Sequence, residues 1–300
     1  MKKFINNISI ILTGLFFCLA IMAGKASAQD EATKPEEAKA KPVKNTFGSV
    51  WLMDNQTVMV PVKGTLELDI QHRFGSIENG TEDMFGLFAP SNIRFGLNYA
   101  PIKNLYVGAG LTKERKQVDL NVKYSLLQQT TDNKVPVSVA YFGNAVIDTR
   151  NKSNFRYGVH RLSYFNQLIV ARKVTEKFSI QAAPSFSWFN NVEGYLDKNG
   201  DIQSKMKNGH LAVSVLGRYK ITGQSSIIAG YDQPLTQHAM NNPHPNICFG
   251  FETVTSSHAF QVFFGNYYGI VPQSNNMYNA LDYKDGQFVI GFNITRLWNF

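Results

Sequence analysis

Six charged side chains of both signs fall at alternating positions early in the folded part of the chain. They are Glu67, Asp69, Arg73, Arg94, Asp119 and Lys123. Charged groups on one face of neighbouring strands either line a water-filled passage or form an ion-pair network that fills and rigidifies a closed interior. The sequence leaves both interpretations open, and we predict that these six residues line a lumen.

Two histidines, His72 and His160, each precede an arginine, and Ser163 follows the second by three residues. A serine beside a histidine can act as nucleophile and base, which suggests a lipid-modifying enzyme. That chemistry also needs an orienting acid and an oxyanion donor, for which the sequence gives no clear signal. Because His72 falls on the same face as Leu68 and Ile70, a structural or interfacial role is favoured, and we assign no catalytic residue.

Metal, cofactor and nucleic-acid sites are not indicated. His238 and His244 share one loop but lack a third ligand. Cys248 stands alone once Cys18 is removed with a predicted signal peptide. The whole chain carries +8; without the three lysines of residues 1–28, 27 basic residues face 22 acidic ones, a net charge of +5. That modest excess forms no dense basic block, so we expect no nucleic-acid partner, no metal and no cofactor.

The charged residues lie in runs that alternate polar and apolar positions. In residues 65–74 the apolar side chains keep to the even positions and the charged ones to the odd positions, which is the period of a strand. Pro184 falls inside a later run, where we expect a bulge because proline cannot donate to a ladder. About twelve such runs follow one another, near 65–74, 92–99, 105–112, 117–126, 137–147, 161–171, 178–189, 211–221, 226–232, 246–253, 259–266 and 287–300.

The connections between the runs alternate in length. Short ones of four to seven residues alternate with long ones rich in Asn, Asp, Gly and Pro, and the hairpin at 113–116 is the exception on the long side. This asymmetry is typical of outer-membrane barrels, which have short periplasmic turns and long outer loops. After residue 28 no run is apolar for long enough to span a bilayer as a helix, so a membrane location requires a closed barrel. We therefore predict an all-β protein, a closed antiparallel transmembrane β-barrel of about 12 strands.

The ends of the chain carry predicted targeting signals. Residues 1–28 combine an early pair of lysines, an apolar stretch and a small-residue cleavage pattern, which predicts a cleaved signal peptide. Residues 29–45 form a charged tether that we expect to be disordered. Residues 46–62 form either a plug or a periplasmic hairpin, and residues 63–300 form the barrel. The last run ends on Trp298 and Phe300, similar to the signal read by the outer-membrane barrel insertion machinery, so we expect that machinery and outer-membrane lipid as partners.

Three segments carry a resemblance to a known family: His72–Gly75, His160–Tyr164 and Gln167–Lys173, together with the Phe300 ending. With these features the chain resembles a family of uncharacterised Bacteroidetes-type outer-membrane β-barrel proteins. The resemblance implies a Gram-negative outer-membrane location and a barrel fold. It implies no reaction and no catalytic residues.

Three functions fit these observations. The leading hypothesis is a channel or facilitator for a small solute with a polar, charged lumen, because the charged residues share the predicted inner face. The first alternative is a non-conducting scaffold or adhesin that binds partners through its long loops and tether. The second is the lipid-modifying barrel enzyme suggested by His72, His160 and Ser163.

Overall fold

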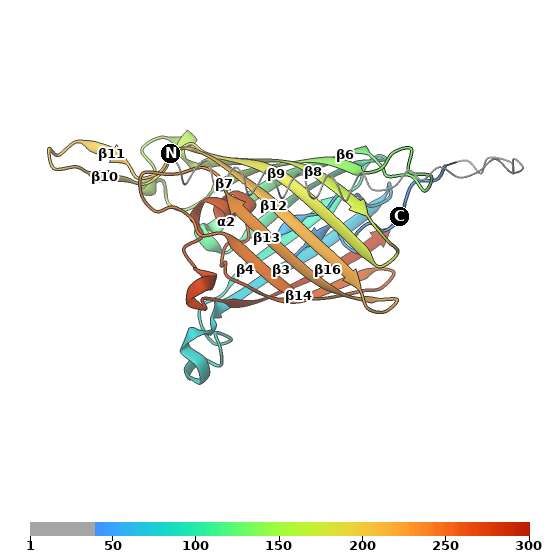
Figure 1. Cartoon of the computed structure of the whole chain (residues 1–300). Helices are drawn as coiled ribbons and strands as arrows, with labels where there is room; N and C mark the ends of the chain where they lie inside the picture. Colours follow the sequence, from blue (N-terminus) through green and yellow to red (C-terminus); the bar gives the residue numbers. More distant parts are fainter. Residues whose placement is uncertain (1–39) are drawn as a thin grey trace, which may run out of the picture.

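The computed structural model describes residues 40–300, and its main feature is a closed barrel of twelve antiparallel strands (Figure 1). Each strand pairs with its neighbours along the chain, and the last strand pairs with the first to close the cylinder. This confirms the predicted fold and strand number; the predicted signal peptide and most of the tether lie outside the described residues. The barrel strands are β3 (Thr65–Ser76), β4 (Asn92–Tyr99), β5 (Leu105–Thr112), β6 (Gln117–Leu127), β7 (Ser138–Asp148), β8 (Leu162–Lys173), β9 (Phe178–Phe189), β12 (Gly209–Lys220), β13 (Ser225–Pro234), β14 (Asn246–Val254), β15 (His258–Gly265) and β16 (Val289–Asn299).

The two ends of the barrel differ, as the connection lengths predict. One end carries only short turns, and the other carries longer loops with most of the small elements, including a hairpin that projects from the loop end in Figure 1. Among residues 40–300 no helix is long and apolar enough to cross a membrane. The small elements are β1 (Trp51–Leu52), β2 (Asn55–Gln56), η1 (Ile77–Asp83), η2 (Glu114–Lys116), η3 (Lys152–Asn154), η4 (Gly158–Arg161), β10 (Gly194–Leu196), β11 (Ile202–Ser204), α2 (Pro272–Tyr278) and η5 (Tyr283–Asp285).

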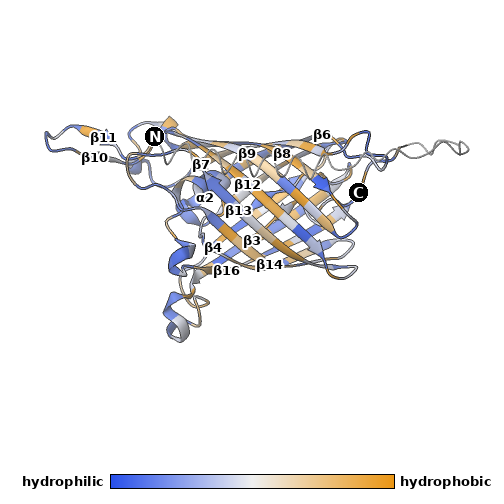
Figure 2. Ribbon diagram, viewed as in Figure 1, coloured by the Kyte–Doolittle hydropathy of each residue, from blue (hydrophilic) through white to orange (hydrophobic). Residues whose placement is uncertain are grey.

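The outer face of the barrel is apolar. Side chains alternate between buried inner positions and exposed outer positions along most strands, and polar and apolar residues mix along the ribbons in Figure 2. The exposed outer residues include Leu97, Leu120 and Phe251, at 54%, 58% and 62% exposure. A polar outward residue, Asn166, accepts a hydrogen bond from the Tyr141 hydroxyl at 2.5 Å, so its carbonyl is paired within the wall. Such a surface suits hydrocarbon better than water.

The prediction of a bulge at Pro184 is wrong. Pro184 pairs with Val213 of β12 in a register that continues unchanged on both sides. On its other side, the ladder with β8 lacks pairs opposite Leu168 and Ile169 and then resumes in the same register. Proline's missing donor therefore interrupts the ladder locally without inserting an extra residue.

The interior is not uniformly polar, which departs from the expected division of polar and apolar faces. The inner wall of β3, β4 and β6 is polar, but the strands on the other side of the barrel turn apolar residues inward. These buried residues form one cluster with apolar side chains of chain segment 47–58. The inward apolar residues of the wall therefore pack against this segment and do not face water. The wall residues of this cluster include Phe142, Phe165, Ile169, Leu216, Ile228 and Phe263.

Candidate functional site: the barrel interior and its mouths

Three of the six sequence-predicted charged residues form one compact ion-pair cluster on the inner wall. The Arg94 guanidinium donates to Asp69 at 2.6 Å and to both carboxylate oxygens of Asp119 at 2.9 Å. Asn98 donates to Asp69 at 2.6 Å, and Asn144 donates to Asp119 at 3.1 Å. All of these side chains are buried, and the two carboxylates face one fully paired guanidinium. This part of the set behaves as the ion-pair network, one of the two interpretations left open by the sequence.

Glycines on the inner face make room for this cluster. A Cβ at Gly96 would overlap Asp69 and Arg94, and a Cβ at Gly110 would overlap Arg94 and Asp119. The charged side chains therefore lie flat against the wall where a larger residue would push them into the lumen. The glycines of β4 and β5 are thus part of the site, because they set how far the charges project.

Arg73 and Lys123 instead reach a segment that is not part of the barrel wall. We call residues 46–62, which precede β3, the inner segment. Lys123 donates to the Gln56 side chain at 2.6 Å and to the Thr57 carbonyl at 3.1 Å. Arg73 donates to Asn293 at 3.0 Å and approaches the Met53 carbonyl at 3.4 Å. The sixth residue, Glu67, accepts from the Tyr106 hydroxyl at 2.7 Å.

The inner segment is a hairpin that enters and leaves the lumen at the short-turn end. Before it, Val43 donates to the Gln129 carbonyl of a short turn at 2.7 Å; after it, Gly64 donates to the Ala100 carbonyl of another at 2.8 Å. Between these points β1 pairs with β2, and Met53 at the tip adopts a left-handed φ of 56°. Three wall side chains bind its backbone. Gln181 accepts from the Val58 amide and donates to the Gln56 carbonyl. Gln261 accepts from the Met53 amide and donates to the Trp51 carbonyl, and Asn293 donates to the Met53 carbonyl.

Apolar side chains of the hairpin fill the space beside the apolar part of the wall. Phe47, Leu52 and Met53 are fully buried, and Trp51 is 3% exposed. The Trp51 ring meets Phe142 edge-on at 6.1 Å between centroids. The hairpin therefore occupies the lumen with both polar and apolar contacts, as a small protein core would.

From the opposite end, the loop between β15 and β16 folds into the barrel and meets the tip of the hairpin. Asp54 accepts from Tyr267 at 3.1 Å and from Asn275 of α2 at 2.5 Å. Gln273 donates to Ser163 of β8 at 3.3 Å, which ties α2 to the wall. The lumen is thus occupied from both ends, and the two obstructions touch at Asp54.

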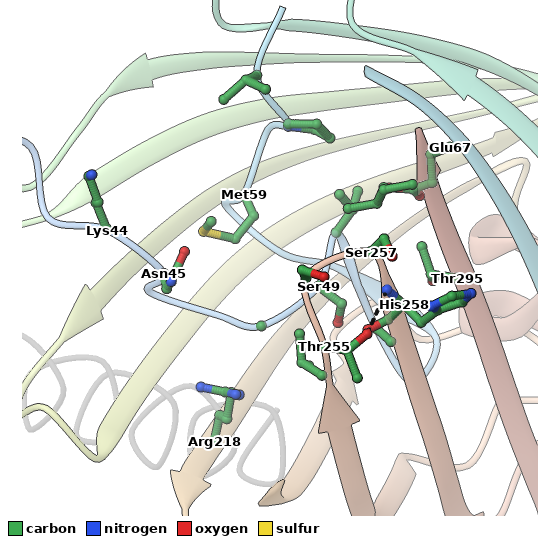
Figure 3. Close-up of a pocket in the computed structure, with 18 of the residues that line it drawn as sticks. Lys44, Asn45, Ser49, Met59, Glu67, Arg218, Thr255, Ser257, His258 and Thr295 are labelled. Atoms are coloured by element: carbon green, nitrogen blue, oxygen red, sulfur yellow. Dashed lines mark hydrogen bonds between the residues drawn. The ribbon is translucent and has the colours of Figure 1, made fainter. Parts of the chain in front are cut away.

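A cavity of about 870 Å³ remains at the short-turn end, beside the hairpin (Figure 3). Its lining includes Lys44, Arg218 and His258, with Glu67 at one side. Arg218 pairs with the buried Glu252 at 2.6 Å. This cavity opens toward the turns and ends where the inner segment blocks the barrel.

The three residues behind the enzyme hypothesis do not form a catalytic group. The His72 ring lies on the outer wall, stacked on Phe292 at 4.9 Å, whereas Ser163 is buried on the inner wall. His160 sits in η4 and packs edge-on against Tyr157 at 5.1 Å. Within residues 40–300 no hydrogen bond joins any two of the three. The nucleophile and base pairing that the enzyme alternative requires is absent from the described part of the chain.

The predicted loop histidines also separate. His244 pairs with Asp282 at 3.2 Å, while His238 contacts His210 of β12 at 2.9 Å between ring nitrogens and accepts from the Lys207 amide at 3.0 Å. In the described residues no group of three or more His, Cys, Asp or Glu is placed to hold a metal ion. The partnership of His210 with His238 was missed because the two lie 28 residues apart, and only the barrel register brings them together.

Comparison with known proteins assigns the chain to a family. Residues 47–298 match the family described as a membrane bound beta barrel domain (DUF5777). The chain belongs to this family. The match begins within the inner segment, so the family's domain includes most of the hairpin as well as the barrel. This confirms the predicted resemblance to a barrel family without an assigned reaction.

Solved structures with a similar chain path include two outer-membrane β-barrels. The NanC porin is 10% identical, with a TM-score of 0.45 over 78% of this chain and 99% of that chain. An outer membrane channel from Pseudomonas putida F1 is 12% identical, with a TM-score of 0.47 over 80% of this chain and 97% of that chain. A comparison with curated proteins found no match.

Proposed function

We propose that the protein is an outer-membrane channel for small polar solutes and that the inner segment closes it in this structure. The observation that carries the proposal is the hairpin itself, which enters and leaves at one end of a wall that is complete without it. Withdrawing it breaks no strand pair of the barrel. What remains is a cylinder lined on one side by charged and amide groups.

The strand number supports this proposal. Eight strands enclose a space that side chains just fill, whereas 16 to 18 strands leave an aqueous channel. Twelve strands lie between these limits, so an additional segment is needed to fill the interior. In the proposed orientation the short turns and the inner segment face the periplasm and the long loops face outward, as in other barrels of this kind. The predicted signal peptide would deliver the chain there.

The second candidate function is a non-conducting scaffold or adhesin. It is favoured by the double obstruction, because both the hairpin and α2 must move before a solute can pass. Under this proposal the hairpin is a permanent core, and the long loops bind partners outside the cell.

Planar-bilayer recording separates the two candidates. The full chain is expected to conduct rarely, and a variant lacking both residues 46–62 and α2 is expected to conduct continuously, because both obstructions are then removed. Because that deletion removes a core, its folding is checked by the mobility shift on heating in detergent gels. A second variant, Gln181→Ala with Gln261→Ala, keeps the hairpin but removes two side chains that bind its backbone; it is expected to open more often than the native chain. Folded variants that never conduct would exclude the channel and leave the scaffold.

A further inference from the structure

A small cavity at the loop end contains more positive than negative charge. Its volume is about 200 Å³, and it lies where the hairpin between β5 and β6 is short and leaves the mouth uncovered. Three arginines line it from two loops: Arg115 from η2 in the connection between β5 and β6, and Arg150 and Arg161 from the connection between β7 and β8. Such convergence from separate segments is typical of a binding site and differs from a single charged loop.

Two of the three guanidiniums lack a carboxylate. Asp148 binds Arg150 through both carboxylate oxygens, at 2.7 to 3.1 Å. The other acidic lining residue, Glu193, pairs with Lys205 at 3.5 Å. In the part of the chain that the structure describes, neither Arg115 nor Arg161 forms an ion pair with a carboxylate. The cavity therefore holds two positive charges that a ligand could neutralise.

The two guanidiniums are held in place by their surroundings. Arg161 donates to the carbonyls of Asp148 at 2.9 Å and Arg150 at 2.8 Å and stacks over Phe155 at 4.6 Å. Arg115 lies over the Tyr278 ring at 5.1 Å, and its own backbone has a left-handed φ of 53°. Guanidiniums fixed in this way are suited to bind oxyanions through two parallel hydrogen bonds.

The floor of the cavity connects to the loop that closes the lumen. Ser163 and Gln117 line the cavity, and they are the residues that bind Gln273 and Ser274 of α2, at 3.3 Å and 3.4 Å. The side-chain oxygens of Gln117 and Gln273 are buried and have no hydrogen-bond donor among the described residues. A molecule in this cavity would therefore touch the contacts that hold α2 in the barrel.

We propose that this mouth cavity binds a small soluble organic anion through Arg115 and Arg161. A cavity of 150 Å³ can hold benzene, so about 200 Å³ suits a solute of one ring, such as a sugar acid. That the anion then moves inward past α2 rests on the proposed channel function. The binding step does not, because it takes place on the closed protein.

The test is binding of glucuronate to the purified full chain in detergent, measured by calorimetry, with glucose as the neutral probe of the same size. Glucuronate is expected to bind and glucose is not. Arg115→Gln is expected to weaken glucuronate binding about tenfold or more, because a hydrogen bond to a charged group is lost. Arg115→Lys, which keeps the charge without the fork, is expected to recover part of that loss.

Lys152→Gln is the matched control, because it removes one exposed charge from the neighbouring loop without lining the cavity. Equal binding of glucuronate and glucose, or equal losses in Arg115→Gln and Lys152→Gln, would overturn the proposal. So would selective binding of phosphatidylglycerol in place of glucuronate, because the anion would then be a lipid headgroup. If the protein does not conduct in a bilayer, the channel proposal fails but glucuronate binding is unaffected, so the two proposals can be tested independently.

Discussion

Cys248 is a natural reporter of the inner segment. It is 3% exposed on the inner face of β14 and belongs to the apolar cluster that includes Leu52 and Met53 of the hairpin. In a Cys18→Ser background it is the one cysteine of the chain. A thiol reagent in the lumen can therefore reach it only after the hairpin moves, and we expect Leu52→Ala to accelerate its labelling.

The size of the effect follows from burial. Leu52 is fully buried, and replacing a buried leucine by alanine costs about 2 to 5 kcal/mol. The substitution destabilises only the docked hairpin, because residue 52 of the withdrawn hairpin is in water. At about 1.4 kcal/mol per tenfold change, the withdrawn population rises at least about 30-fold. The labelling rate rises by the same factor as long as withdrawal is a rapid equilibrium.

The assay is pulse labelling with a small maleimide, read by mass, on the folded protein in detergent. Leu97→Ala is the control, because it removes the same atoms from an outward residue that is 54% exposed and leaves the hairpin untouched. The reasoning is refuted if Cys248 of the native protein reacts as fast as it does after unfolding. It is equally refuted if Leu52→Ala and Leu97→Ala label at the same rate.

Three further predictions concern the wall and the loops. Gly110→Ala is expected to destabilise the barrel by about 1 to 3 kcal/mol and lower its melting temperature, whereas Gly217→Ala, where a Cβ meets nothing within 4 Å, is expected to have little effect. Arg94→Leu leaves two buried carboxylates without a cation and is expected to cost about 3 to 5 kcal/mol in denaturant unfolding; converting both carboxylates to amides recovers part of it. Burial, with the charge on Lys207, lowers the pKa of His238 below its usual value, so the unfolded loop takes up the proton first as pH falls. Stability is therefore present above about pH 6.5 and lost as the pH falls through the folded pKa. Proteolysis of residues 235–245 should be faster at pH 5 than at pH 7.5, and this difference should be smaller in His238→Asn, which keeps the His244–Asp282 pair.

The sequence predicted the barrel well because each strand separates two solvents. Runs such as 65–74 place lipid-facing and lumen-facing residues on alternate positions, and that alternation is local information. The twelve runs and the short turns therefore matched the structure closely. The same alternation placed the six charged residues on one face, but it did not show that Arg94 binds two carboxylates while Arg73 and Lys123 reach the hairpin.

The path of the inner segment could not be read from alternation, because it depends on contacts with strands far along the chain. One signal was present. The run 138–148 carries apolar residues on both faces, with Phe142 and Val146 turned inward, and a strand facing water on one side has no need of them. Apolar residues on both faces of a membrane strand indicate that something apolar lies inside the barrel.

The tip of the hairpin has a consequence for assembly. The Met53 carbonyl is bound by Asn293 of β16 at 2.6 Å and approached by Arg73 of β3 at 3.4 Å, and these two strands become neighbours only when the cylinder closes. The hairpin thus bridges the seam from within, and it is covalently continuous with one of the strands that form it. In a newly inserted molecule the lumen would therefore be closed as soon as β16 pairs with β3, and no open pore would form in the membrane during assembly.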